Sequence, residues 1–321
     1  MRTARAGCPE KIFGETDRME WEVGLIEWIQ KALGSLNNTV GAALSFIGGE
    51  LGLLLVLLII LFCWKKESGK RLALIITAVN TWLPMIKAAV MRPRPYMEYP
   101  DRVQGVADVG NSASLDDIAA QGYSFPSTHS ASTVALFTPL AAEVKKRWMW
   151  IIAVLITLLV GVSRAITGMH YPTDILAGWA LGLAGAGIVL LLEKKVKNEW
   201  IRHLILLASV LPGIFFARTE DYYTSLGLMI GLIAAIHFEA KYVNFRDTRN
   251  IWAMILRVAG AFVIYFVLNT VLKLPFSKEF LAGGTTGAFL VRAARYAVII
   301  FVIIGIYPKV FPLFEKIGKK N

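Results

Sequence analysis

Long apolar segments joined by short connections dominate this sequence of 321 residues. A helix needs roughly 20 mostly apolar residues to cross a hydrocarbon core of about 30 Å, and several segments meet that requirement. The sequence is 56% hydrophobic and only 18% charged, which is too apolar for an ordinary soluble domain. We therefore expect an all-α membrane protein, a polytopic helical bundle with about nine spanning helices in total. The expected spans are 41–64, 72–90, 130–144, 148–166, 175–192, 201–216, 225–238, 252–272 and 297–314.

The N-terminal region differs from these spans. Residues 1–18 are polar and show no period, which predicts a disordered tail. Over residues 19–40, apolar side chains recur at helical spacing and charged side chains decorate the other face, so we expect an amphipathic interfacial helix. The apolar positions are Trp21, Leu25, Ile26, Ile29, Leu33 and Leu36, and the charged positions are Glu20, Glu22, Glu27 and Lys31.

The positive charge of the sequence is gathered in its connections. The net charge is +11, and basic clusters occur at every second connection, a pattern that marks the cytoplasmic face of membrane proteins. Because topology explains this charge, we do not expect nucleic-acid binding. The same alternation places the loops 96–125 and 168–173 on the opposite face. The clusters are Lys65, Lys66, Lys70 and Arg71; Lys145, Lys146 and Arg147; Lys194, Lys195 and Lys197; Lys241, Arg246 and Arg249; and Lys316, Lys319 and Lys320.

Three groups of polar residues lie at helix ends on that opposite face. Taken singly, each has an ordinary structural explanation: cations extend to lipid headgroups, proline and serine begin helices, and a His–Asp pair can be structural. Together, however, they place two of the four histidines beside four cations. The groups are Lys87 with Arg92, Pro93, Arg94 and Pro95; Pro126, Ser127, Thr128 and His129; and Ser163, Arg164, His170 and Asp174.

Phosphoryl transfer is the chemistry that uses such a set, because the transferred group gathers negative charge on its oxygens. Arg94 and Arg164 offer planar forks to phosphate oxygens, and Lys87 supplies a point charge. The helix that starts at Pro126 aims free N–H groups at an anion, and Ser127 adds a hydroxyl donor. We therefore predict a phosphate site at this face.

The histidines and the aspartate provide the reacting groups. If Asp174 accepts a hydrogen bond from one ring nitrogen of His170, the other nitrogen is free for in-line attack on phosphorus. His129 then protonates the departing oxygen and later deprotonates the water that hydrolyses the phosphohistidine. We expect neither a metal nor a cofactor, because cationic side chains neutralise the charge and no cluster of carboxylates lies nearby to hold magnesium.

These residues resemble the three motifs of the type 2 phosphatidic acid phosphatase (PAP2) superfamily of membrane phosphatases. The resemblance implies that His170 is the phosphorylated nucleophile, with Asp174 as its partner and His129 as the acid. It also implies a phosphate clamp of Lys87, Arg94 and Arg164, assisted by Ser127 and the Thr128 amide. Thr128 stands where the family has glycine, which adds a side chain beside the phosphate. The motifs read Lys87, Arg94 and Pro95; Pro126, Ser127, Thr128 and His129; and Ser163, Arg164, His170 and Asp174.

The resemblance predicts a PAP2-like catalytic transmembrane core over residues 41–195 and leaves 196–321 as a C-terminal transmembrane extension. The expected reaction is hydrolysis of a lipid phosphate or polyprenyl diphosphate, with membrane lipid as the other partner. Alternatives are a phosphotransferase that uses the same phosphohistidine, a phosphatase of a soluble phosphomonoester with the loop 96–125 as a lid, and, behind these, a non-enzymatic lipid-binding or transport protein. We expect a plasma membrane location, in a bacterial inner or cytoplasmic membrane, with the active site facing the periplasm or exterior. The sequence predicts no oligomeric state.

Overall fold

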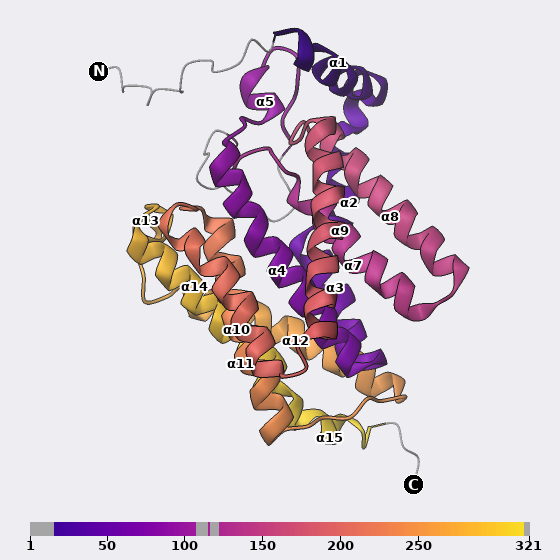
Figure 1. Ribbon diagram of the computed structural model, residues 1–321, viewed down its shortest axis with the longest axis vertical. Helices are drawn as coiled ribbons and strands as arrows, with labels where there is room; N and C mark the ends of the chain where they lie inside the picture. The colour runs from indigo at the N-terminus through magenta and orange to yellow at the C-terminus, as the bar shows by residue number, and fades with distance from the viewer. Residues whose placement is uncertain (1–15, 107–114, 116–121, 318–321) are drawn as a thin grey trace.

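The computed structural model describes residues 16–106, 115 and 122–317, and all regular secondary structure in that part of the chain is helical (Figure 1). The N-terminal half of the chain forms α1 (Thr16–Leu33), η1 (Gly34–Leu36), α2 (Asn37–Gly48), α3 (Glu50–Ile59), η2 (Ile60–Trp64), α4 (Lys66–Val90), α5 (Pro95–Glu98), α7 (Thr128–Val144) and α8 (Arg147–Ile166). The C-terminal half forms α9 (Pro172–Lys195), α10 (Glu199–Val210), η3 (Leu211–Phe215), α11 (Glu220–Tyr242), α12 (Ile251–Val271), α13 (Lys278–Ala282), α14 (Thr286–Phe301), η4 (Val302–Ile306), η5 (Tyr307–Val310) and α15 (Phe311–Phe314).

Seven helical stretches in the described part of the chain are long and apolar enough to cross a membrane. The expected number of about nine is therefore not confirmed. Two of the expected spans are not among these seven. They correspond to α7, with 17 residues, and α10, with 12. At 1.5 Å per residue they are about 26 and 18 Å long, less than a hydrocarbon core of about 30 Å. α7 is short because Ser127 caps its start and Lys145 ends it in the left-handed conformation, with φ 56°.

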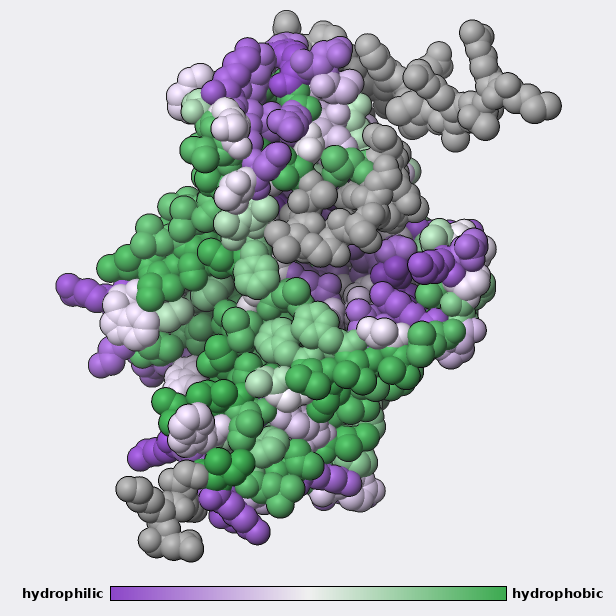
Figure 2. All heavy atoms as spheres, turned by 180° about the vertical axis from the view of Figure 1, so that it is seen from behind, coloured by the Kyte–Doolittle hydropathy of each residue, from purple (hydrophilic) through white to green (hydrophobic). Residues whose placement is uncertain are grey.

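Apolar side chains cover the outside of the bundle. On α8, Ile151, Leu155 and Leu158 are exposed, as are Val263 and Phe266 on α12. Figure 2 shows these kinds of residue as a broad hydrophobic band between hydrophilic ends. A surface this apolar needs lipid around it, so the chain is a multi-pass membrane protein.

One end of the bundle collects the basic connections. Lys65, just before α4, pairs with Glu143 at the end of α7 at 2.7 Å, and Arg71 pairs with Glu193 at the end of α9 at 2.7 Å. Lys70 pairs with Glu239 at the end of α11 at 2.8 Å. The predicted basic connections after α7, α9 and α11 therefore meet at the start of α4. The end of α4, with the three polar groups, lies at the opposite end of the molecule, about 36 Å away along its 25 residues.

Close packing of α9 against α7 aligns their first turns. A Cβ atom added at Gly178 would lie 2.5 Å from the carbonyl oxygen of Ser127, and one at Gly182 would lie 2.4 Å from that of Ala131. Small residues four apart let membrane helices approach to backbone contact. Because those neighbours are backbone atoms, only glycine fits, and the start of α7 is held against α9.

The N-terminal helix differs from its expected bounds. α1 starts at Thr16, inside the predicted tail, and ends at Leu33, where Gly34 turns the chain with φ 51°. The predicted helix 19–40 therefore ends early, and α2 starts within it. The rest of the predicted tail, residues 1–15, lies outside the described residues. α1 lies across the end of the bundle opposite to α15 (Figure 1).

The predicted extension forms a helical unit on the flank of the core. α11 packs against α14 and also against α4, so the extension contacts the core along the helix that carries Lys87. Arg257 and Arg295 are buried within this unit, where their guanidinium groups donate to backbone or side-chain oxygens of Phe62 and Asn269.

Candidate active site

The predicted site residues come from the ends of four helices. Lys87 is in the last turn of α4, and Arg94 follows that helix; Ser127, Thr128 and His129 begin α7; Arg164 is in the last turn of α8; His170 and Asp174 flank the start of α9. The structure buries six of them at one end of the bundle, namely Lys87, Arg94, Ser127, Arg164, His170 and Asp174.

Arg94 ties the first group to the third. The chain leaves α4 through Met91, whose left-handed backbone (φ 52°) turns it back across the helix end. Arg94 then donates from Nη1 to the carbonyl oxygen of Met169 and from Nε to that of Gly122, both at 3.1 Å. Because Met169 precedes His170, this bond fixes the loop that carries the predicted nucleophile.

The turn between α8 and α9 brings Arg164 and His170 together. The amides of Met169 and His170 both donate to the carbonyl oxygen of Arg164, at 3.2 Å. Gly168 makes this turn possible, since its φ is 66° and an added Cβ would lie 2.4 Å from the carbonyl oxygen of Gln104. The six-residue separation of Arg164 and His170 in the sequence thus becomes direct proximity.

Among the described residues, Asp174 accepts three hydrogen bonds, none of them from His170. Its Oδ1 accepts from Arg92 at 2.7 Å, and its Oδ2 accepts from the Tyr171 amide at 2.9 Å and from the Ser124 hydroxyl. The distance from Oδ2 to His170 Nδ1 is 3.7 Å, which is beyond a hydrogen bond. The expected His170–Asp174 hydrogen bond is therefore not formed, because the other donors occupy Oδ2.

The surroundings of His170 keep its ring neutral. Burial lowers the pKa of the imidazole well below its ordinary value, and the charges of Arg94, Lys87 and Arg164 and the ring of His129 lower it further. A cation held among cations away from water is unfavourable. Lys87 and His129, like Arg94 and Arg164, are therefore close enough to the ring of His170 to act on it electrostatically.

The first turn of α7 adds hydrogen-bonding groups. The Ser127 amide donates to the carbonyl oxygen of Asp174 at 3.0 Å, and its Oγ caps the helix by accepting from the Ser130 amide at 3.4 Å. The hydroxyl oxygen of Thr128 is buried and has no hydrogen-bond partner in the described part of the chain. An unsatisfied buried hydroxyl is costly, and an anion at this helix start would satisfy it.

His129 faces the junction of α2 and α3. A Cβ added at Gly49, the residue between those helices, would lie 3.8 Å from His129 Nε2. The sequence predicted one continuous span over 41–64, whereas the structure divides it at Gly49. The division places a residue without a side chain beside the predicted acid.

Three residues at the site were not predicted to act there. Arg92 was assigned to the cationic group but explained as a headgroup contact; it instead binds Asp174 and Glu22, and its guanidinium lies 3.9 Å from the centre of the Tyr171 ring. Glu22 was expected on an exposed polar face, yet it is 3% exposed. Ser124 carried no signal beyond its position two residues before Pro126. The doubled Arg-Pro at 92–95 is the sequence feature that pointed to Arg92.

The chain matches two family models. The model of the PAP2 superfamily matches residues 69–197, and the model described as the transmembrane extension of PAP2 superfamily phosphatases matches residues 223–319. The first covers all of the predicted site residues, and the second covers most of the predicted extension.

Three curated relatives share parts of the sequence. The chain is 27% identical to phosphatidylglycerophosphatase B of Bacillus subtilis over 174 residues, which are 50% of this chain and 77% of the relative. It is 42% identical to undecaprenyl-diphosphatase of Sulfolobus acidocaldarius over 62 residues, 19% of this chain and 29% of the relative. It is 33% identical to lipid A 4'-phosphatase of Bacteroides thetaiotaomicron over 75 residues, 23% of this chain and 33% of the relative.

The last two matches thus span about a third of each relative or less, and no solved structure matches the chain. The two family models nevertheless cover the core and the extension in the expected order. The chain belongs to the PAP2 superfamily of phosphatases and carries the transmembrane extension of that family.

Proposed function

We propose that this protein hydrolyses a membrane lipid phosphate or diphosphate through a phosphohistidine at His170. The observation that carries the proposal is the burial of His170 together with Lys87, Arg94 and Arg164 at one end of a membrane-spanning bundle, where burial and the three cations lower the pKa of the imidazole and favour its neutral form. A neutral ring nitrogen is nucleophilic, and the same cations that keep it neutral attract the phosphate that it attacks.

The geometry favours Nε2 as the attacking atom. Nδ1 lies on the side of Asp174, at 3.7 Å from its Oδ2. As the bond from Nε2 to phosphorus forms, the ring becomes positively charged, and the nearby carboxylate stabilises that charge without a direct hydrogen bond. Asp174 thus acts electrostatically in this mechanism, while Arg92, Ser124 and the Tyr171 amide keep it in place.

The leaving oxygen takes its proton from His129 as its bond to phosphorus breaks. Water then gives a proton to His129 and attacks the phosphohistidine, which breaks the N–P bond, releases inorganic phosphate and restores neutral His170. The amides at the start of α7 and the Thr128 hydroxyl face the phosphate oxygens in both steps.

The position of the site supports a lipid substrate and an extracytoplasmic orientation. The site is at the end of α4 opposite to the basic connections, and such connections face the cytoplasm in membrane proteins. A phosphate headgroup reaches this level while its apolar chains stay beside the helices. The three relatives are named as phosphatases of undecaprenyl diphosphate, phosphatidylglycerophosphate and lipid A, and these names agree with this class of substrate.

Phosphate release by the purified protein tests the proposal. In EDTA, over a panel of phosphatidic acid, lysophosphatidate, undecaprenyl diphosphate, phosphatidylglycerol phosphate and glucose phosphate, we expect free phosphate from at least one lipid and a loss of at least about 1,000-fold in His170→Ala. Release from glucose phosphate alone would indicate a soluble substrate instead. Consumption of lipid without free phosphate would indicate transfer to a second acceptor.

A further inference from the structure

α1 buries a carboxylate in the start of another helix. Glu22 is 3% exposed. Its Oε1 accepts from the amide of Thr173 at 2.9 Å and from the Thr173 hydroxyl at 2.6 Å, and its Oε2 accepts from Arg92 at 2.8 Å. The sequence separation of Glu22 and Thr173 is 151 residues. A buried carboxylate is stable only when its oxygens are satisfied in this way.

The contact between Glu22 and Thr173 lies directly beside Asp174, the carboxylate of the proposed mechanism. Thr173 is the second residue of α9 and Asp174 is the third, so Glu22 caps the turn that carries Asp174 and complements the positive end of that helix. Arg92 binds Glu22 with Nη2 and Asp174 with Nη1. α1 therefore holds Asp174 both through the backbone of α9 and through the Arg92 guanidinium.

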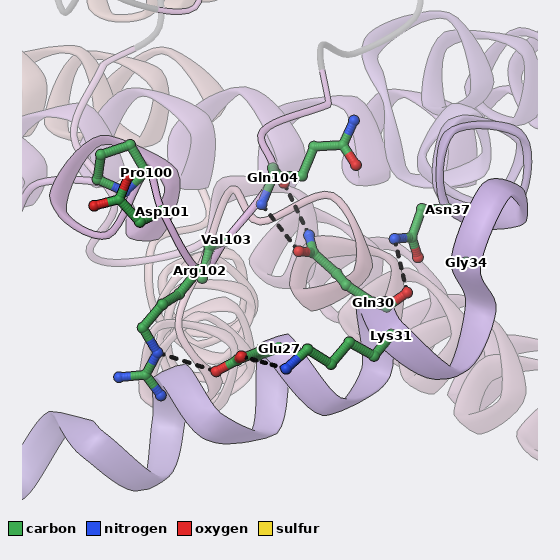
Figure 3. Close-up of a pocket in the computed structure, with 10 residues that line it drawn as sticks. All are labelled: Glu27, Gln30, Lys31, Gly34, Asn37, Pro100, Asp101, Arg102, Val103 and Gln104. Atoms are coloured by element: carbon green, nitrogen blue, oxygen red, sulfur yellow. Dashed lines mark hydrogen bonds and ion pairs between the residues drawn. The ribbon is translucent and has the colours of Figure 1, made fainter.

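A second attachment fixes α1 along its length. The Gln30 amide donates to the carbonyl oxygens of Gln104 and Ile166 at 2.8 and 2.9 Å and accepts from the Gln104 amide at 3.0 Å. Gln30 lines a pocket of about 470 Å³, and Figure 3 shows its side chain bonded to Gln104, with Glu27 bonded to Arg102 in the same pocket. Ile166 ends α8, two residues after Arg164. α1 thus contacts both segments that flank His170.

The opposite side of α1 is apolar and uncovered. Trp21, Leu25 and Trp28 follow one another by four and three residues, so they share one face of the helix, and they are 55%, 39% and 66% exposed. α1 lies across the end of a membrane-spanning bundle (Figure 1). Tryptophan is the side chain that prefers the headgroup level of a bilayer, and a helix with such a face lies in that interface.

We infer that α1 is an interfacial positioning helix: Trp21, Leu25 and Trp28 dock on the bilayer surface, and Glu22, through Arg92 and Thr173, sets the position of Asp174 beside His170. Glu22 and Arg92 are positioning residues, because they act on Asp174 through hydrogen bonds to its carboxylate and to its neighbour Thr173. The inference rests on the proposed function for its kinetic consequences. Contact of the Trp21, Leu25 and Trp28 face with lipid does not depend on the proposed function and is tested separately.

The first test removes the charge of Glu22. With a short-chain phosphatidic acid that is monomeric in solution, we expect Glu22→Gln to lower kcat about 10-fold with KM changed less than twofold. Glu20→Gln is the matched control, since Glu20 is an exposed residue of the same helix that pairs with Arg102, and its kcat stays within twofold. Arg92→Gln should lower kcat similarly, and the double variant should be no worse than Arg92→Gln alone, since the two residues act on Asp174 as one unit. Additive losses, or a loss confined to KM, would overturn the positioning role.

The second test separates the effect of bilayer docking by α1 from the effect of the hydrogen bonds of Glu22. In lipid nanodiscs we expect the wild-type kcat on the same monomeric substrate to exceed its value in detergent several-fold. Trp21→Ser with Trp28→Ser should bring that ratio to about one without lowering the detergent value. A double variant that keeps the wild-type ratio would contradict the coupling. Quenching of tryptophan fluorescence by brominated lipids, weaker in the double variant, checks the docking itself even if no substrate is turned over. Equal quenching in both proteins would contradict the docking.

Discussion

The Oδ2 atom of Asp174 lies 3.7 Å from Nδ1 of His170, while the hydrogen bonds of that carboxylate go to Arg92, Ser124 and the Tyr171 amide. The carboxylate is therefore bound by the scaffold and acts on the ring through its charge. This differs from a pair in which the aspartate selects the tautomer by a direct bond.

Replacing Asp174 by asparagine tests the electrostatic role. The asparagine side chain keeps the size of the aspartate and can still accept from the Tyr171 amide, but it lacks the negative charge that stabilises the phosphorylated ring. We expect Asp174→Asn to slow phosphoenzyme formation about 100-fold in single-turnover experiments. Ser124→Ala removes one bond to Oδ2 and keeps the charge, so it should cost less than about 10-fold. Equal losses in the two variants would show that the hydrogen bond, not the charge, is what matters.

The pH dependence of the first step follows from the lowered pKa of His170. The ordinary value for histidine is 6.5; because the pKa is lower in the folded protein, the ring stays neutral and nucleophilic below pH 6.5. The unfolded chain binds a proton there that the folded protein does not, so this group makes the protein less stable as the pH falls. We expect the acid limb of phosphoenzyme formation to lie below pH 6.5.

Arg94→Gln provides the matched comparison for that limb. Removing one cation raises the pKa of His170, so the acid limb should move to higher pH relative to the wild type on the same substrate. The ionisation of the substrate is common to both proteins and cancels in the comparison. A limb that moves to lower pH, or does not move while kcat/KM falls, would mean that His170 is not the titrating group.

Thr128 should contribute its hydroxyl to phosphate binding. Its Oγ1 is buried and lacks a hydrogen-bond partner among the described residues, and a phosphate oxygen at the start of α7 would provide one. We expect Thr128→Val, which keeps the shape, to lower kcat/KM about 10-fold, a loss of about 1.4 kcal/mol of transition-state stabilisation. Thr128→Ser keeps the hydroxyl and should stay within about threefold. An unchanged Thr128→Val would show that the Thr128 hydroxyl does not bind the phosphate.

The approach of α9 to α7 predicts a stability effect. A Cβ at Gly178 would lie 2.5 Å from the Ser127 carbonyl oxygen, whereas one at Gly187, on the same helix, would meet no atom within 4 Å. Gly178→Ala must therefore separate the two helix starts, and we expect a lower thermal midpoint and a large loss of activity. Gly187→Ala should keep both. If Gly178→Ala kept the wild-type midpoint and activity, the close approach of the two helices would not be needed for the site.

The sequence indicated which residues would lie at one end of the bundle better than it indicated the hydrogen bonds between them. Lys87 and Arg164 lie in the last turns of α4 and α8, and His170 lies in the turn before α9, so all three reach the same end of the bundle. Their catalytic roles stay predictions. The Glu22–Thr173 contact could not be predicted, since it depends on how α1 packs across residues far apart in the sequence. Asp174 Oδ2 accepts a hydrogen bond from Ser124 and not from His170, because the two distances differ by about an ångström. A pattern of residue types does not contain such a difference.

The fold was predicted in the same uneven way. The long apolar runs gave α4, α8, α9 and α12 close to their observed bounds. The number of spans is not confirmed, because Ser127 and Lys145 limit α7 to 17 residues, a limit that hydropathy alone does not reveal. The break at Gly49 was missed for a related reason: a glycine inside an apolar run is compatible with a continuous helix.

Trapping the phosphoenzyme tests the central claim most directly. The protein is mixed with phosphatidic acid, or with the best lipid of the panel, labelled in its phosphate, then quenched in alkali and mapped by peptide. The proposed mechanism predicts label on His170 in the wild type, retained label in His129→Ala because hydrolysis is slowed, and no label in His170→Ala. Turnover near the wild-type rate by His170→Ala, or label on any other residue, would contradict it.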